Sequence, residues 1–213
     1  AMNPRIADCA PPLDLDLLSL LPSPELRSAI AKQKQSYQEA KPFPHICIED
    51  FLPHAVAEAV LDAFPGRSEK FWSQNSIRHE RKLFASLESD IPCPIRNVLL
   101  ALNTRTFLAF LEELTGIENL IADPQFSGGG MHQIVRGGKL DIHVDFNKHF
   151  SYGLDRRVNL LLFLNKDWHE EYGGDLELWD ERERSCVRRI APSFNRCVIF
   201  STSDRSYHGH PHP

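Results

Sequence analysis

The chain has 213 residues, of which 42% are hydrophobic and 25% are charged, and its formal net charge is −5 at pH 7. These values are typical of one globular domain with its own core, and they exclude a disordered or fibrous chain. They also argue against nucleic acid or a membrane as a partner, since nothing in the balance attracts polyanions.

The five cysteines are dispersed, with no zinc-binding spacing. They indicate reduced thiols in a cytoplasmic protein rather than a disulfide framework. We expect no secretory signal and no membrane-spanning helix. The oligomeric state is left open.

The first elements of the chain are an arm and a helix. Residues 1–22 are rich in Pro, Asp and Leu and are expected to form a surface arm. Ser23-Pro24-Glu25 predicts a helix start, because a capping hydroxyl precedes a proline in the first turn. The prolines of Lys41-Pro42-Phe43-Pro44 end this helix at about Ala40.

The next predicted elements are a short strand and two helices. The strand is His45–Ile48. Apolar residues at helical spacing predict the helices, first Val56, Val60 and Phe64, then Phe107, Leu111 and Leu114 with Gly116 as the C-terminal cap.

From about Gln125 the pattern changes to short apolar segments separated by glycine, asparagine and aspartate. The segments are MHQIVR, KLDIHVDF, RVNLLLFLN, DLELWD, SCVRRI, RCVIFS and RSYHG. Short strands at this spacing are typical of an antiparallel sandwich or barrel. The sequence therefore predicts one domain with an α+β, mainly β, fold, helical over about 23–120 and a β core over about 125–213.

His143 and Asp145 lie two residues apart in the segment KLDIHVDF. Residues at this spacing on a strand point to the same face, so both side chains are available to one metal ion. A pair of this kind also arises by chance in a chain with 10 histidines. A third ligand is needed to distinguish the two explanations.

The C-terminal segment RSYHGHPHP offers three histidines. His208 follows the apolar strand CVIFS after a short turn and is the best third ligand. His210 and His212 alternate with prolines and are expected in a mobile tail. Two histidines and one carboxylate form the facial triad of non-haem Fe(II) sites.

The ordered segments around these residues resemble a known family. PFPHICIEDFLP, GGGMHQIVRGGKLDIHVDF, RRVNLLLFLN, YGGDLELW and NRCVIFSTSDRSYHGHP are similar to the Fe(II)/2-oxoglutarate-dependent dioxygenases, in particular the prolyl-hydroxylase-like branch. The resemblance implies a double-stranded β-helix (jelly-roll) core with N-terminal supporting helices, in one oxygenase domain over residues 23–213.

The resemblance also implies the chemistry. His143, Asp145 and His208 would hold Fe(II), and 2-oxoglutarate and O2 would be cosubstrates, with ascorbate as a candidate reductant. The reaction expected is hydroxylation of an unactivated C–H bond, with release of succinate and CO2. A proline or another amino-acid-type compound, small or peptidyl, is the expected substrate.

Further contacts are expected from position within the family pattern. Gln133 and Asn159 lie where polar groups often face the cosubstrate, although each is equally explained as an ordinary strand residue. The Arg or Lys that binds the distal carboxylate of 2-oxoglutarate is expected beyond residue 213, since no basic residue follows His208.

Four residues are candidate substrate contacts. Phe146 adjoins Asp145, and Asn147 and His149 follow on a predicted loop, where substrate specificity is often determined. Arg157, next to Arg156, offers a charge for an acidic group, although an exposed pair at a strand edge is the simpler interpretation.

Two alternatives remain open at this point. A cupin-like metalloenzyme would use the same barrel without 2-oxoglutarate and would need no basic clamp. A non-catalytic β-sandwich binding module would need no metal ligands, yet all three expected ligands are present.

Overall fold

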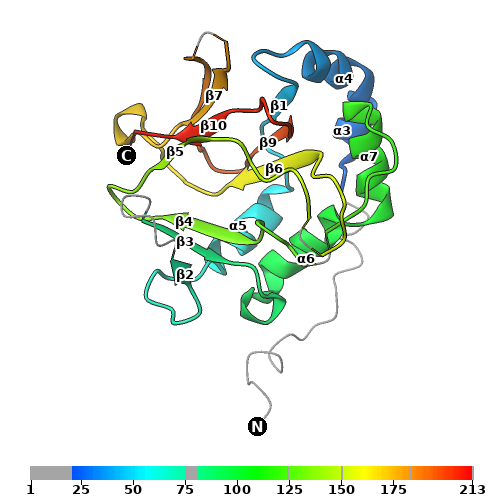
Figure 1. Cartoon of the computed structure of the whole chain (residues 1–213). Helices are drawn as coiled ribbons and strands as arrows, with labels where there is room; N and C mark the ends of the chain where they lie inside the picture. The colour runs from blue at the N-terminus through cyan, green and yellow to red at the C-terminus, as the bar shows by residue number, and fades with distance from the viewer. Residues whose placement is uncertain (1–20, 75–80, 124, 150, 183, 213) are drawn as a thin grey trace.

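The structure is a computed structural model that describes residues 21–74, 81–123, 125–149, 151–182 and 184–212 (Figure 1). Its elements in chain order are α3 (Pro24–Ser28), α4 (Ile30–Glu39), β1 (His45–Ile48), α5 (His54–Asp62), β2 (Ser73–Gln74), β3 (Lys82–Ala85), the 3-10 helix η1 (Glu88–Asp90), α6 (Cys93–Leu102), α7 (Arg105–Thr115), β4 (Met131–Ile134), β5 (Leu140–His143), β6 (Val158–Phe163), the 3-10 helix η2 (Glu170–Tyr172), β7 (Leu176–Asp180), β8 (Ser185–Ile190), β9 (Arg196–Ser201) and β10 (His208–His210).

The named strands pair antiparallel and form three sheets, with strand orders β1-β9-β6, β5-β10-β7-β8 and β2-β3-β4. The order is not sequential, because β9 inserts between β1 and β6 and β10 inserts between β5 and β7. Figure 1 shows the helices gathered to the right of and below the strands, with β5, β7 and β10 at the upper left. The mixed α and antiparallel β class predicted from the sequence is confirmed.

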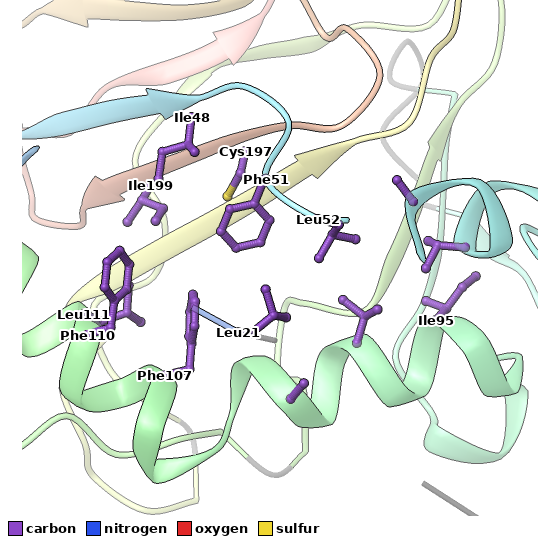
Figure 2. Packing of buried hydrophobic residues seen from close by; sticks show 14 of the residues in the cluster. Leu21, Ile48, Phe51, Leu52, Ile95, Phe107, Phe110, Leu111, Cys197 and Ile199 are labelled. Carbon is purple, nitrogen blue, oxygen red and sulfur yellow. The ribbon is translucent and has the colours of Figure 1, made fainter. Parts of the chain in front are cut away.

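Alternate residues of β9 point into two different apolar layers. Cys197 and Ile199 belong to the larger core, between the helices and the β1-β9-β6 sheet, whereas Val198 and Phe200 belong to a smaller core with Leu178 of β7. All five side chains are fully buried. Figure 2 shows the larger core, where side chains of α7 meet those of β9 and of the segment after β1. Because successive side chains of a strand point to opposite faces, β9 packs against the helices on one face and against the second sheet on the other.

Helix boundaries follow the local chemistry of the sequence. The Ser23 hydroxyl accepts the Leu26 N–H at 3.2 Å and caps α3, as predicted. The Thr104 hydroxyl accepts the Phe107 N–H and caps α7, which ends at Gly116 with a φ of 76°. Only glycine adopts this left-handed conformation freely, so Gly116 is the predicted C-terminal cap.

Other boundaries differ from the prediction. The first predicted helix is divided into α3 and α4, because Ala29 leaves helical dihedral angles. Helix α6 was not predicted, because Pro94 in its first turn resembles a helix breaker although proline is well tolerated there. The expected surface arm does not reach residue 22, since Leu21 is fully buried in the larger core; residues 1–20 lie outside the described residues.

No helix in the described part of the chain has both the length and the apolar character needed to cross a membrane. Cys47, Cys93, Cys186 and Cys197 form no disulfide in the described part of the chain, and Cys9 lies outside it.

Candidate metal centre

His143 and His208 come from neighbouring strands. His143 is the last residue of β5, His208 is the first residue of β10, and the two are direct register partners. Their ring centroids lie 4.6 Å apart. His208 is buried against Phe200 of β9, with ring centroids 4.8 Å apart, so one wall of the site is apolar.

Asp145 completes the cluster. Strand β5 ends at His143, so Asp145 lies two residues beyond the paired strand rather than within it, as the sequence predicted. Its Oδ1 lies 3.7 Å from His143 Nε2 and its Oδ2 lies 3.6 Å from His208 Nε2. One ligand atom from each of the three residues lies within 4.8 Å of the other two. The structure thus brings together the three residues that the sequence nominates as metal ligands.

Both imidazole rings are oriented by backbone carbonyls. His143 Nδ1 lies 2.8 Å from the Asp141 carbonyl oxygen, and His208 Nδ1 lies 2.8 Å from the Ser206 carbonyl oxygen. Because a carbonyl only accepts, each neutral ring carries its proton on Nδ1. Each Nε2 lone pair therefore faces Asp145, as a metal ligand requires.

The electrostatics of the cluster keep its carboxylate charged. Burial alone would raise the pKa of Asp145, but the polar contact with His143 and the charges of His208, Arg156 and His143 outweigh it and lower this pKa to about 2. Contact with Asp145 raises the pKa of His143, whereas burial lowers that of His208. The site thus offers an ionised carboxylate and one imidazole that is readily neutral.

Asn159 of β6 contacts the cluster directly. Its Nδ2 donates to Asp145 Oδ2 at 3.0 Å, and its Oδ1 accepts from Arg156 Nη2 at 3.3 Å. The sequence suggested Asn159 as a contact of the cosubstrate; the structure gives it a carboxylate partner within the protein. Arg156 was interpreted as part of an exposed pair, yet its side chain is 16% exposed and lies 3.6 Å from Asp145. No sequence pattern distinguished it from Arg157.

Gln133 and His132 lie on opposite faces of β4. Register pairs Met131 with Ala85 and His132 with Phe84, and both Met131 and Ala85 are buried in the larger core. Gln133 therefore shares the core-side face, where its Oε1 is buried without a hydrogen-bond partner.

His132 is on the other face. The side chain of His132 is exposed, and its Nε2 lies 3.1 Å from the Gly129 carbonyl oxygen.

The loop after Asp145 carries three of the four candidate substrate contacts. The Phe146 ring centre lies 4.5 Å from Arg156 Cζ, and Asn147 is exposed. His149 Nε2 lies 2.9 Å from Ser127 Oγ, and its ring stacks on Tyr152. These contacts attach the loop to the segment before β4.

Arg157 is exposed, and its carbonyl oxygen accepts the Thr202 N–H. His210 corrects the prediction for the C-terminal segment. It lies within β10, half-buried and paired with Leu140, because its strand continues past His208. Of the three C-terminal histidines, His212 is the one that lies beyond the strand, and its side chain is exposed.

Comparison with known proteins gives one family match and one curated relative. The model of the 2OG-Fe(II) oxygenase superfamily matches residues 129–213, which contain all three residues of the cluster. A stretch of 57 residues is 35% identical to a mouse protein, prolyl 3-hydroxylase OGFOD1. That stretch is 25% of this chain and spans only 10% of the length of the mouse protein.

Solved structures of prolyl hydroxylases share the fold. The Trichoplax adhaerens prolyl hydroxylase in complex with a hypoxia inducible factor peptide fragment is 17% identical, with a TM-score of 0.59 over 88% of this chain and 86% of that one. A Pseudomonas putida prolyl-4-hydroxylase is 14% identical, with a TM-score of 0.57 over 84% of this chain and 91% of that one.

Proposed function

We propose that the chain, whose residues 129–213 match the model of the 2OG-Fe(II) oxygenase superfamily, is a 2-oxoglutarate-dependent hydroxylase whose iron is held by His143, Asp145 and His208. The observation that carries the proposal is the convergence of two imidazole Nε2 atoms and one carboxylate from β5, the segment after it and β10.

The donor set suits ferrous iron. Two neutral imidazoles and one carboxylate are the ligands of the facial triad, which leaves positions open for a bidentate cosubstrate and O2. The carbonyl contacts of both Nδ1 atoms leave both Nε2 lone pairs for a metal. Bound Fe(II) with 2-oxoglutarate would supply O2 activation, which hydroxylates a C–H bond and releases succinate and CO2.

The residues of the chain orient the ligands and limit access of water. Asn159 holds the Asp145 carboxylate at 3.0 Å, and Phe200 packs on the His208 ring. The buried Oε1 of Gln133 has no partner, a feature that a bound polar ligand would explain. Asn159 and Gln133 remain our candidates for contact with the cosubstrate.

We also propose that the β1-β9-β6 and β5-β10-β7-β8 sheets form the two faces of a double-stranded β-helix. The smaller core between them, with Leu178 and Phe200, supports this arrangement. In the proposed single domain from residue 23 onward, the helices support the outer face of the first sheet.

The proposed substrate is a proline, free or within a peptide. The names of the mouse relative and of the similar solved structures support this class, since each is a prolyl hydroxylase. We place Phe146, Asn147, His149 and Arg157 at the substrate side, because the loop that contains the first three begins next to Asp145.

An anaerobic titration tests the proposal. Purified protein receives Fe(II) and then 2-oxoglutarate, and the weak visible charge-transfer band of a 2-oxo acid chelated to ferrous iron is followed. His143→Ala is the matched control, since it removes one ligand at the end of β5.

We expect the band in the wild type and not in the control. Bound iron without the band would overturn the use of 2-oxoglutarate and favour a cupin-like metalloenzyme. Failure of the wild type to bind iron would overturn the metal centre itself and favour a non-catalytic module.

A further inference from the structure

Arg156 is packed beside the metal-ligand cluster. Its Nη2 lies 3.3 Å from Asn159 Oδ1 and 3.6 Å from Asp145 Oδ2. The guanidinium also lies over the Phe146 ring, with Cζ 4.5 Å from the ring centre. One planar group therefore contacts a carboxylate, an amide and an aromatic ring.

The surroundings fix Arg156 in this position. Its backbone N–H donates to the Asn147 carbonyl at 2.8 Å, and the Thr202 hydroxyl donates to its carbonyl at 2.7 Å. A Cβ at Gly128 would lie 2.8 Å from the Phe146 ring and 3.2 Å from Arg156 Nη1, so the Gly128 backbone closes over the pair. The guanidinium has little room to turn away.

This packing determines the orientation of the Asn159 side-chain amide. A primary amide has one accepting oxygen and one donating nitrogen, and rotation about the amide axis exchanges them. Because Arg156 can only donate, it selects the orientation in which Asn159 Oδ1 faces the guanidinium. The Nδ2 group then faces Asp145, where it donates to Oδ2 at 3.0 Å.

The two contacts act on the same carboxylate oxygen. Asn159 Nδ2 donates to Oδ2 of Asp145, and Arg156 forms its ion pair with that atom. The same oxygen lies 3.6 Å from His208 Nε2, whereas Oδ1 lies 3.7 Å from His143 Nε2. The contacts of Asn159 and Arg156 thus fix the carboxylate with one oxygen toward each histidine.

We propose that Arg156 is a positioning residue of the metal centre, which fixes the Asn159 amide and through it the orientation of the Asp145 carboxylate that would bind the metal. This inference rests on the proposed function, because it assumes that Asp145 is a metal ligand.

The proposal predicts that loss of the Arg156 side chain changes metal affinity in the direction opposite to that expected from charge repulsion alone. A cation next to a divalent ion weakens binding of that ion by Coulomb repulsion, so loss of the Arg156 charge alone would tighten metal binding. Loss of positioning weakens it, because partners that orient metal ligands contribute about 10- to 100-fold to metal affinity. The direction of the change therefore separates the two roles.

The test is Co(II) binding to the purified protein, followed by calorimetry and by the visible spectrum of the bound ion, without 2-oxoglutarate. The variants are Arg156→Gln, Arg156→Lys, Asn159→Ala and the double variant Arg156→Gln/Asn159→Ala. The control is Arg105→Gln, which removes an equal charge from the exposed pair with Glu112 on α7. Circular dichroism confirms that each variant is folded.

We expect Arg156→Gln and Asn159→Ala each to weaken Co(II) binding about tenfold and to alter the spectrum. The double variant should lose little more than either single variant, because both act on one oxygen. Arg156→Lys should recover only part of the affinity, since an ammonium keeps the charge but lacks the planar group that lies over the Phe146 ring. Arg105→Gln should bind as the wild type does.

Unchanged or tighter Co(II) binding by a folded Arg156→Gln would overturn the positioning role and leave the metal centre intact. Additive losses in the double variant would overturn the route through Asn159. If the wild type binds no Co(II), the proposed function fails, and this inference fails with it.

Discussion

Asn195 and Leu52 form a reciprocal pair of hydrogen bonds. The Asn195 Nδ2 group donates to the Leu52 carbonyl oxygen at 2.8 Å, and its Oδ1 accepts the Leu52 N–H at 2.9 Å. Asn195 is buried and has a φ of 58°. One side chain thus joins the turn before β9 to the segment after β1.

We predict that Asn195→Ala lowers the free energy of unfolding by about 3 kcal/mol, because it leaves a buried N–H and a buried carbonyl unpaired. Asn195→Gly loses the same bonds but tolerates the positive φ, so it should be about 1 kcal/mol more stable than the alanine variant. Urea unfolding measures both. A loss below about 1 kcal/mol for alanine would show that the segment does not depend on this pair.

Gly209 separates the two histidines of β10. A Cβ at this position would lie 2.7 Å from the Leu140 carbonyl oxygen and 2.9 Å from that of Asp141, both on β5. We predict that Gly209→Ala separates β10 from β5 and costs about 2 kcal/mol in thermal or urea unfolding.

The same substitution should weaken Co(II) binding, because it moves His208 relative to His143. Gly66→Ala is the control, since no heavy atom lies within 4 Å of a Cβ there. Equal metal affinity in Gly209→Ala and the wild type would contradict this account of the strand contact.

Tyr37 is fully buried and bonds the Ser201 hydroxyl at 2.7 Å. Burial raises the pKa of Tyr37 to about 12, although the Ser201 bond acts in the opposite direction. The unfolded phenol ionises near pH 10, so the folded state loses stability as the pH rises above that value.

We predict that Tyr37→Phe costs about 1 kcal/mol at neutral pH and makes this alkaline loss shallower. Ultraviolet absorbance of the phenolate, recorded during alkaline titration, should lose its last step in the variant. Persistence of that step would assign it to another tyrosine.

His45 is buried, and its Nδ1 lies 2.9 Å from the Phe43 carbonyl oxygen. Burial, with the Arg188 charge, lowers the pKa of His45 against the effect of that hydrogen bond. Below about pH 6.5 His45 becomes protonated in the unfolded chain but stays neutral in the folded protein, because its pKa is lower there. The free energy of unfolding therefore falls as the pH decreases through that range.

We predict a smaller loss of stability between about pH 7.5 and pH 5.5 for His45→Asn than for the wild type, because asparagine donates a similar bond without titrating. Urea unfolding of metal-free protein at both pH values gives the comparison. Equal losses would exclude His45 as a source of the acid sensitivity.

The local features of this molecule could be read from the sequence, whereas its long-range contacts could not. Short apolar segments between turn residues predicted β7, β8 and β9, and helical spacing predicted α7 with its Gly116 cap. Which strands pair is a property of the folded chain, so the insertion of β10 between β5 and β7 could not be predicted.

The same distinction holds for the candidate site. His143 and Asp145 were nominated because they are close in sequence, and His208 because it follows an apolar strand. Arg156 was missed, because its importance depends on the Phe146 ring and the Gly128 backbone that surround it in space. Adjacent arginines are indistinguishable until the fold buries one of them.

His143 and His208 are cross-strand neighbours although a long stretch of chain separates them. A metal ion bound to both is therefore a cross-link that closes a long loop. The unfolded chain would lose conformational entropy on forming that loop, so it binds the ion more weakly than the folded protein does. Because such an ion binds the folded state preferentially, it raises the free energy of unfolding by about 2.7 kcal/mol when its free concentration is a hundred times its Kd. The melting temperature of this protein is then a property of the buffer as well as of the chain, and chelator and metal should move it in opposite directions.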